Sequence, residues 1–412
     1  MNVLQNKTSM SAAMSGHEVR PPRAQLMPSL RRVAQQMVSP ALRLSLKRLA
    51  ASAREQAYRA CVWRWEAVAL SAPSDKPYRF VHLGRRANRA ETLFRFAGTS
   101  SLERNDESTG TVRTAPAAVV LIGDLRTPGS LRVPVFVHSV VPLRRPIEEI
   151  LGSFDNNLRR TIRQQQVGCE VRQATSDADI DFADQVMLRP YATARHGPTA
   201  SQLAPELVRK MARRDGRLDI LYQHGEAVAC NLCHASVRDG KTYWTGMRAG
   251  YPEAVFSDQK RLSQVNTINA HLGMLWAHAN DFDYFDFGMS IGSPDDGMLR
   301  WKKARGAHVD TSLTNSYFYV RLPKSGTAQL LWDSPLFSTS GKLLTLHIGL
   351  PADIADDVAA LRYRDMSYGG LQRVCLHRAR PVSEALIEAL RKLFTKPHHG
   401  TVPTFETIAV GS

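Results

Sequence analysis

The sequence predicts a mixed α/β protein. Between residues 169 and 322, short apolar segments with the two-residue period of strands alternate with longer segments that have the period of helices, and the alternation returns from residue 342 onward. The chain has 412 residues, which at about 100–200 residues per domain allows two or three domains with a sizeable buried core. Hydrophobic residues make up 43% and charged residues 22%, so most of the chain is expected to fold.

Changes in charge and pattern divide the chain into four expected regions. These are a basic tail with an amphipathic helix at 1–72, a sheet-rich half at 73–150, a larger α/β domain at 151–325 and a small α/β unit at 326–412. Strands are predicted in the sheet-rich half at 78–83, 92–97, 117–122 and 133–139. A helix begins at Pro146 and ends near Gly168, where a glycine can terminate it.

The basic N-terminal region holds half of the excess charge. The whole chain has 54 Lys and Arg against 38 Asp and Glu, a net charge of +16, and residues 1–72 contribute 11 basic and three acidic residues. Leu and Ala at spacings of three and four between residues 42 and 57 predict a basic amphipathic helix. Residues 31–64 could therefore contact an anionic membrane surface or RNA, or the helix could pack on the following domain.

The larger domain is expected to form a mixed sheet with a central hairpin. Its predicted strands are 169–173, 217–222, 227–236, 242–247, 284–288 and 316–322, and its predicted helices are 176–188, 204–213, 260–279 and 297–305. The C-terminal unit is expected to contain a strand from residue 342, a helix at 354–363, a strand at 373–377 and a helix at 383–394.

The cysteines indicate reduced thiols and no metal centre. Five cysteines without regular spacing are typical of a cytoplasmic chain. Residues 230–234 have the C-x-x-C-H spacing of covalent haem attachment, but they lie in a predicted strand, where positions an odd number apart face opposite sides. Cys230 and Cys233 are therefore expected to be separate core residues.

Several functional classes lack their sequence signatures. The chain has no phosphate-binding loop of the G-x-x-x-x-G-K-[ST] type, no G-x-G-x-x-G after a strand and no G-x-S-x-G elbow. Residues 246–250, between the hairpin and the long helix, are a weak candidate for an anion-binding loop. The longest apolar run, 115–122, is too short to cross a bilayer, so we expect a cytoplasmic protein or one peripheral to the membrane.

The strongest local signal is F-D-F-G-M-S at 285–290, followed by G-M-L-R-W-K-K-A-R-G-A at 297–307. These segments resemble the FemAB-like branch of the GNAT acyltransferase superfamily, with departures at Trp301, where the family has Phe, and Arg305, where it has an aromatic residue. Residues 157–168, 195–197 and 225–229 resemble further segments of that family in the same order. The resemblance covers about residues 133–322.

The resemblance implies a fold and a reaction. The fold would be two tandem GNAT-like halves, the first shortened, and the domain at 151–325 would be catalytic. The reaction would transfer an acyl or aminoacyl group to an amine. A splayed or bulged central strand would offer free backbone N–H groups to the donor carbonyl. The co-substrate would be an acyl-CoA or acyl-carrier thioester with no tightly bound cofactor, and the acceptor a small amine or a cell-envelope amine.

The chemistry requires a group that accepts the amine proton and cations that stabilise negative charge. Asp286 is a candidate to orient or deprotonate the amine, Lys302 to bind a phosphate or stabilise developing charge, and His196 to act as a base. Each has a structural alternative: a turn carboxylate, a solvated lysine and an exposed loop histidine. The candidate substrate-binding residues are Arg159, Arg160, Arg163, Tyr243, Trp244, Ser290 and Tyr317.

The sequence therefore predicts a basic N-acyltransferase that uses an acyl-CoA or acyl-carrier thioester. Two alternatives remain open. One is an aminoacyl-tRNA-dependent transferase of the FemAB type, which would suit the net charge of +16. The other is a non-enzymatic protein that binds nucleic acid or a membrane surface.

Overall fold

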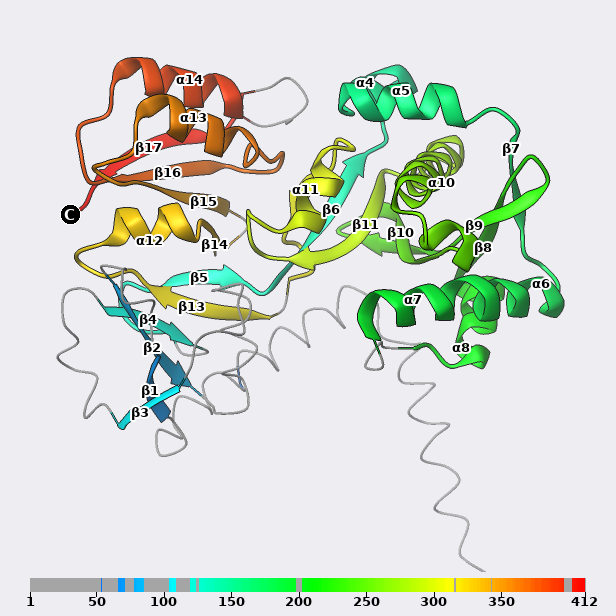
Figure 1. The fold of residues 1–412 in the computed structure, drawn as a ribbon, viewed down its shortest axis with the longest axis horizontal. Helices are drawn as coiled ribbons and strands as arrows, with labels where there is room; N and C mark the ends of the chain where they lie inside the picture. Colours follow the sequence, from blue (N-terminus) through cyan, green and yellow to red (C-terminus); the bar gives the residue numbers. More distant parts are fainter. Residues whose placement is uncertain are drawn as a thin grey trace, which may run out of the picture. The chain divides into compact units, whose positions relative to one another are not determined.

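The computed structural model describes residues 53, 66–70, 78–84, 104–108, 119–123, 126–197, 202–314, 316–341, 343–395 and 402–411. The chain divides into two compact units, Met1–Leu49 and Ala50–Ser412, and all of these residues belong to the second. The predicted tail, nearly all of the amphipathic helix and the strand at 92–97 lie outside the described residues and stay predictions. Among the described residues the second unit has three sheets, which confirms the mixed α/β fold (Figure 1).

The first sheet has the strand order β3-β1-β2-β4-β13-β5. Its apolar face, which includes Val120, Ile122 and Val320, packs with Leu330 and Leu331 of the short helix α12 (Thr327–Asp333). The strands are β1 (Glu66–Leu70), β2 (Arg79–Gly84), β3 (Arg104–Ser108), β4 (Val119–Gly123), β5 (Leu131–Pro134) and β13 (Tyr317–Arg321).

The second sheet has the order β12-β6-β11-β10-β9-β8-β7. Its strands are β6 (Phe136–Pro142), β7 (Cys169–Gln173), β8 (Gly216–Gln223), β9 (Glu226–Arg238), β10 (Lys241–Gly250), β11 (Tyr284–Ile291) and β12 (His308–Asp310). The pair β10 and β11 is parallel, whereas β11 with β6 and β10 with β9 are antiparallel. Parallel neighbours need a long crossover. Here α9 (Glu253–Phe256) and the 21-residue helix α10 (Gln259–Ala279) supply it.

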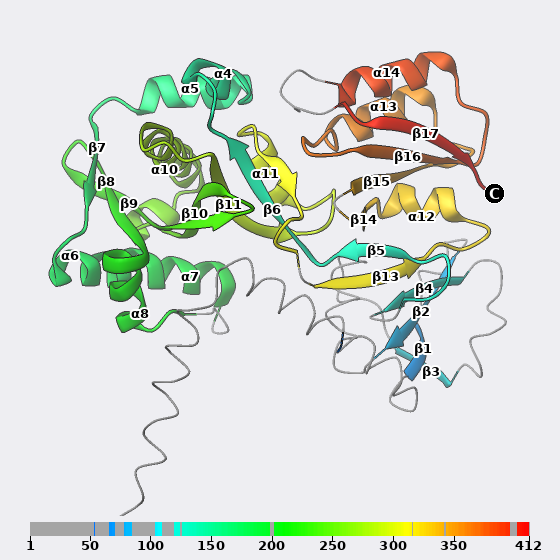
Figure 2. The same cartoon turned by 180° about the vertical axis from the view of Figure 1, so that it is seen from behind.

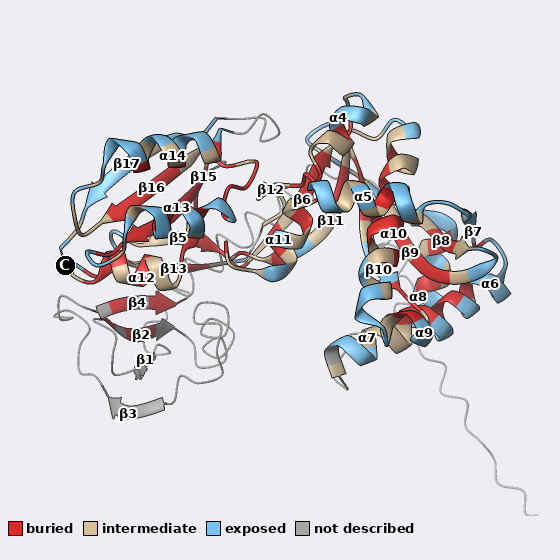
Figure 3. Cartoon of the chain, turned by 45° about the horizontal axis from the view of Figure 1, so that its top comes forward, coloured by how far each residue is buried: buried red, intermediate tan, exposed pale blue. Residues whose placement is uncertain are grey.

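Helices cover both faces of this sheet (Figures 1 and 2). One face packs with α10 and with α5 (Asn156–Gln165), which follows α4 (Ile147–Gly152). The other carries α6 (Asp177–Phe182), the π-helical turn η3 (Ala183–Leu188), α7 (Arg189–His196), α8 (Pro205–Lys210) and the π-helical turn η5 (Met211–Asp215). Figure 3 shows buried residues along β8 and β9 between the two layers.

Cys230 and Cys233 lie on opposite faces of β9, as the strand period predicts. Cys230 packs in the core beneath η3 and Cys233 in the core beneath α10. Burial raises the pKa of both thiols. Among the described residues, no group of three or more His, Cys, Asp or Glu is placed to hold a metal ion. No described helix is long and apolar enough to cross a membrane.

The third sheet has the order β14-β15-β16-β17 and lies in the C-terminal part of the chain. Helices α13 (Asp356–Arg364) and α14 (Glu384–Phe394) cover one face of it, and α12 packs against β15 (Figure 1). The strands are β14 (Leu336–Ser340), β15 (Leu343–Leu350), β16 (Arg373–Arg378) and β17 (Thr404–Ala409). The sequence analysis predicted neither β17, whose side chains are mostly exposed, nor the short elements α12 and β14.

The structure corrects several local predictions. The predicted strand at 133–139 is two strands, because the chain passes from β5 in the first sheet to β6 in the second. Strand β13 pairs with β4 and β5 in the first sheet, although it comes after the strands of the second sheet in the sequence. The helix predicted at 176–188 continues through η3 into α7, so His196 ends a helix and does not lie in a loop. Residues 246–250 belong to β10, paired with β9, and do not form a loop.

The third sheet encloses a histidine pair that should make the fold sensitive to acid. Ser338 Oγ lies 2.8 Å from His347 Nε2, and His347 Nδ1 lies 3.1 Å from His377 Nε2, all in buried positions. Burial lowers the pKa of His347 to about 3, with the neighbouring His377 and Arg373 contributing, and burial lowers the pKa of His377 to about 4. Both rings are therefore neutral in the folded chain at neutral pH.

We expect the free energy of unfolding to fall by about 3 kcal/mol from this pair between pH 6.5 and pH 5, because unfolded histidines take up protons there and the folded ones do not. Urea unfolding of the full chain at the two pH values measures the change. The variant His377→Gln should lose about half of the pH dependence. An equal pH dependence in the variant and the native chain would contradict the assignment.

Candidate active site

The candidate site lies where β10 and β11 separate. The two strands pair only at Tyr243–Tyr284, Trp244–Phe285 and Thr245–Asp286. Beyond this point β10 has a bulge between Gly246 and Arg248, and the pairing of β11 with β6 shifts between Asp286 and Met289. Strands that separate leave backbone polar groups without ladder partners. This is the splayed central pair that the sequence resemblance implies.

Glycine is required at position 288. Its φ of 76° is in the left-handed region, and a Cβ there would lie 3.2 Å from the carbonyl oxygen of Gly246. The Gly288 N–H donates to Asp286 Oδ1 at 2.8 Å, so the turn that ends the pairing also fixes the carboxylate. The D-F-G sequence therefore sets both the backbone and the side chain at this point.

Asp286 is fully buried and holds two basic side chains. His138 Nδ1 lies 2.9 Å from Oδ2, and Arg238 Nη2 donates to the same oxygen at 2.7 Å. Burial raises the pKa of this carboxyl, but the hydrogen bonds and charges of His138 and Arg238 outweigh it, so the pKa is lowered overall. An ionised carboxylate with these partners orients its neighbours better than it accepts a proton.

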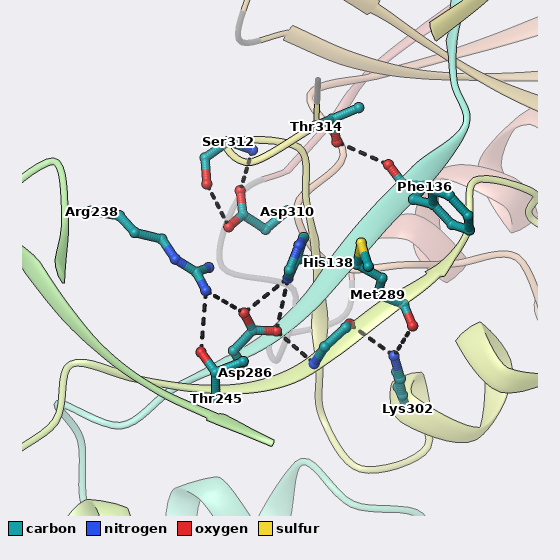
Figure 4. Close-up of polar contacts among 11 residues, drawn as sticks. Phe136, His138, Arg238, Thr245, Asp286, Met289, Lys302, Asp310, Ser312 and Thr314 are labelled. Carbon is teal, nitrogen blue, oxygen red and sulfur yellow. Dashed lines mark hydrogen bonds and ion pairs between the residues drawn. The ribbon is translucent and has the colours of Figure 1, made fainter. Parts of the chain in front are cut away.

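His138 is a site residue that the sequence analysis missed. It comes from β6, and its side chain is 12% exposed. Because the ionised Asp286 can only accept hydrogen bonds, Nδ1 carries a proton, and in the singly protonated form of the ring Nε2 is an acceptor. Figure 4 shows the imidazole of His138 in contact with the carboxylate of Asp286. A carboxylate–histidine pair of this kind is the arrangement of a general base.

Lys302 lies against the other edge of the turn. It is 3% exposed, and Nζ donates to the carbonyl oxygens of Gly288 and Met289 at 2.8 and 2.9 Å (Figure 4). Its helix α11 (Gly297–Lys303) is capped by Asp296, whose side chain accepts from Leu299 N. Burial lowers the pKa of Lys302 to about 8, although the charges of Asp286 and Asp296 oppose the change. An ammonium has three N–H groups, and these two contacts use two of them.

Tyr243 borders the same cluster. Its ring stacks on Tyr284 at 4.8 Å between centroids, and the Arg238 guanidinium lies 4.1 Å from its ring centroid. Burial raises the pKa of Tyr243 to about 12, and the negative charge of Asp310 adds to it. Of the predicted binding residues, Tyr243 is therefore beside Asp286 and its partners.

Other predicted binding residues lie elsewhere. Trp244 faces the opposite side of β10 and packs on Trp276 and Phe282 in the core beneath α10. Tyr317 is in the first sheet, where its hydroxyl donates to the Thr314 carbonyl oxygen at 2.9 Å. The alternation of side chains along a strand shows that Tyr243 and Trp244 face opposite sides of the sheet, but it does not identify the side that carries a site. Trp244 was therefore predicted as a binding residue together with Tyr243.

Ser290 and the three arginines do not join the cluster either. Ser290 is buried opposite Val137, one residue from Met289, and its Oγ has no hydrogen-bond partner among the described residues. His196 ends α7. The three arginines lie on α5, which packs on α10; Arg159 hydrogen-bonds to Asn156, and the other two, Arg160 and Arg163, are exposed.

Arg305, where the family has an aromatic residue, ties α11 to α10. It is buried, donates to the carbonyl oxygen of Trp301 at 2.9 Å and to Thr267 Oγ1 at 2.8 Å, and stacks 3.7 Å above the Trp301 ring. Burial lowers its pKa to about 10. The guanidinium thus fills the place of an aromatic ring by stacking, which keeps α11 in position beside β11.

A cavity of about 360 Å³ lies on the α10 face of the second sheet, among residues of α5, β8, β9 and α10. Leu221, Val228 and Val265 form its apolar part, and Lys260 and Arg261 lie at its edge. None of the predicted site residues lines it.

Comparisons with known proteins give no match to a family model and none to a curated protein. Among solved structures, the chain is similar to FemX, with 12% identity over 64% of this chain and 90% of that chain and a TM-score of 0.36. It is similar to the C-terminal domain of a lysylphosphatidylglycerol synthetase from Agrobacterium fabrum, with 12% identity over 67% and 90% and a TM-score of 0.33. A tandem GNAT protein from the clavulanic acid biosynthesis pathway matches with 12% identity over 61% and 77% and a TM-score of 0.26.

The second sheet itself has the feature that the sequence resemblance implies: its parallel pair β10 and β11 separates after three residue pairs.

Proposed function

We propose that the chain is an N-acyltransferase that moves an acyl group from an acyl-CoA or acyl-carrier thioester to an amine at the separation of β10 and β11. The observation that carries the proposal is the pair of His138 with the buried Asp286 at that point, with Nδ1 of the ring 2.9 Å from the carboxylate. An amine must lose protons during acyl transfer, and an oriented neutral imidazole is suited to accept them.

In the proposed reaction, the amine nitrogen attacks the thioester carbonyl, and His138 Nε2 takes a proton from the amine as it does so. The new C–N bond forms, the carbonyl oxygen becomes an oxyanion, and the ammonium of Lys302, held at the turn by the Gly288 carbonyl oxygen, would stabilise that charge. The C–S bond then breaks, and the sulfur leaves as a thiol after taking up a proton. Asp286 keeps the imidazole in one tautomer and orientation throughout.

The test is transfer by the purified full chain from a panel of donors to a panel of amines. The donors are acetyl-, medium- and long-chain acyl-CoA, an acyl-carrier thioester and an aminoacyl-tRNA, and mass spectrometry detects the amide. We expect amide product and equimolar free thiol from a thioester donor. Product from the aminoacyl-tRNA alone would overturn the thioester donor in favour of a FemAB-type reaction. Thiol release without amide, or no product from any donor, would overturn the transferase.

A further inference from the structure

We propose that Asp310 binds the acceptor as an ammonium ion beside His138, so that the acceptors of this site are primary alkyl amines that arrive positively charged. The inference rests on the proposed function for its reaction, but the binding of the cation can be measured without any donor.

Asp310 lies directly across from His138. In the antiparallel pairing of β12 with β6, the partner of Asp310 is His138. Directly paired residues point to the same face, with Cβ atoms about 4.5–5.5 Å apart. Figure 4 shows the two carboxylates on different sides of the imidazole, Asp286 at its base and Asp310 toward its far end. A ligand at the free nitrogen of His138 is therefore within reach of Asp310.

The two carboxylates differ in their partners. Asp286 is fully buried and is held by His138, Arg238 and a backbone N–H. Asp310 is only partly buried and accepts from Ser312 N and Ser312 Oγ, both at 2.8 Å. Within the part of the chain that the structure describes, no lysine, arginine or histidine forms an ion pair with Asp310. The hydrogen bonds from Ser312 thus fix the position of the Asp310 carboxylate, and no described cation pairs with it.

The other neighbour of His138 is apolar. Met289 of β11 pairs directly with His138 on the side away from β12 and is 61% exposed. His138 consequently stands between a carboxylate on one neighbouring strand and an exposed thioether chain on the other. This pattern suits an ammonium group on an alkyl stem, with the charge at Asp310 and the stem along Met289.

The placement also suits the chemistry of an amine near neutral pH. An alkyl amine has a pKa near that of lysine, about 10, and arrives as an ammonium ion. Asp310 would hold the cation, and His138 Nε2 would take one proton from it and pass that proton to solvent. The neutral amine then attacks the thioester carbonyl while His138 Nε2, deprotonated again, takes its second proton and passes it to the departing sulfur. The sum is ammonium ion plus thioester giving amide, thiol and one released proton.

The variant Asp310→Asn tests the role because the amide keeps the shape: its oxygen can accept from Ser312 N, and its NH₂ can donate to Ser312 Oγ. We expect the KM for hexylamine to rise by about 10- to 50-fold, the scale of one lost charge-assisted contact. The KM for hydroxylamine, which is uncharged at pH 7.5, should change less than about twofold. The matched control is Asp281→Asn, which removes a surface carboxylate paired with Arg144 and should change neither value. Equal losses for both acceptors would assign Asp310 a structural role and overturn the proposal.

Calorimetric titration of the full chain with hexylamine, without a donor, separates the two proposals. We expect binding to the native chain and to Asp281→Asn, and at least about 10-fold weaker binding to Asp310→Asn. If the native chain fails to transfer an acyl group but binds hexylamine through Asp310, only the proposed function is overturned. If the native chain transfers acyl groups but binds hexylamine no better than Asp310→Asn does, only the ammonium site is overturned.

Discussion

The variant His138→Gln should lower kcat/KM for acyl transfer by about 10²- to 10⁴-fold, the range that positioned proton transfer contributes in enzymes. The glutamine amide can donate a hydrogen bond to Asp286 in place of Nδ1–H, so the buried carboxylate keeps a partner. An amide cannot take up and release a proton near neutral pH. The loss should therefore appear mainly in kcat, with the KM for the thioester nearly unchanged.

A second variant distinguishes proton transfer from a structural role. In His138→Ala the ring is absent, and added imidazole should restore part of the rate if its task is to carry a proton. Circular dichroism and the melting temperature serve as folding controls for both variants. An active His138→Gln enzyme, or a well-folded His138→Ala enzyme that imidazole does not rescue, would contradict the role of His138 as a base.

Asp286 is a poor direct test of the same role because of its environment. The side chain of Arg238 is 9% exposed and pairs with Asp286. Removing one partner of a buried ion pair costs about 3–5 kcal/mol, because the other charge is left without compensation. The variant Asp286→Asn would thus lose activity for two reasons at once. His138 lies at the edge of the cluster. A substitution there tests proton transfer and leaves the ion pair of Asp286 with Arg238 in place.

Local pattern identified the motif but not the whole cluster. Asp286 and Lys302, which the F-D-F-G segment and the basic helix after it singled out, both lie at the turn that ends the β10 and β11 pairing, and their roles stay predictions. Both residues lie in a short stretch, so their proximity follows from local structure. His138 is 148 residues away from Asp286 in the sequence, and nothing in a local pattern shows that β6 lies beside β11.

Arg238 and Asp310 were missed for related reasons. Arg238 ends β9, and its side chain reaches across β10 to Asp286, a contact that depends on the order of the strands. Asp310 lies in the three-residue strand β12, which is too short to give a period of two. The strand order of the sheet, which assembles these side chains, follows from packing over the whole domain and not from any one segment.

Lys302→Ala should lower kcat/KM by about 10²- to 10³-fold, the scale of one lost contact to a developing oxyanion. Lys302→Met should give a similar loss, because it keeps the apolar stem and removes the charge. Neither variant should lower the melting temperature greatly, since removing a buried cation offsets the loss of two hydrogen bonds. The neighbouring Lys303 is the matched control: its Nζ donates to the Arg364 and Asp365 carbonyl oxygens on the surface, so Lys303→Ala should leave the rate unchanged.

The pH dependence of the rate tests the charge of Lys302 directly. Burial lowers its pKa to about 8, so the ammonium is present below that pH and is lost above it. A required ammonium predicts that kcat/KM falls as the pH rises through about 8, although free amine becomes more abundant over the same range. In Lys302→Arg the guanidinium stays charged, and the alkaline fall should move upward or disappear while part of the rate returns. An alkaline fall that persists unchanged in Lys302→Met would assign it to another group and contradict the proposed role of Lys302, because that variant has no charge to lose.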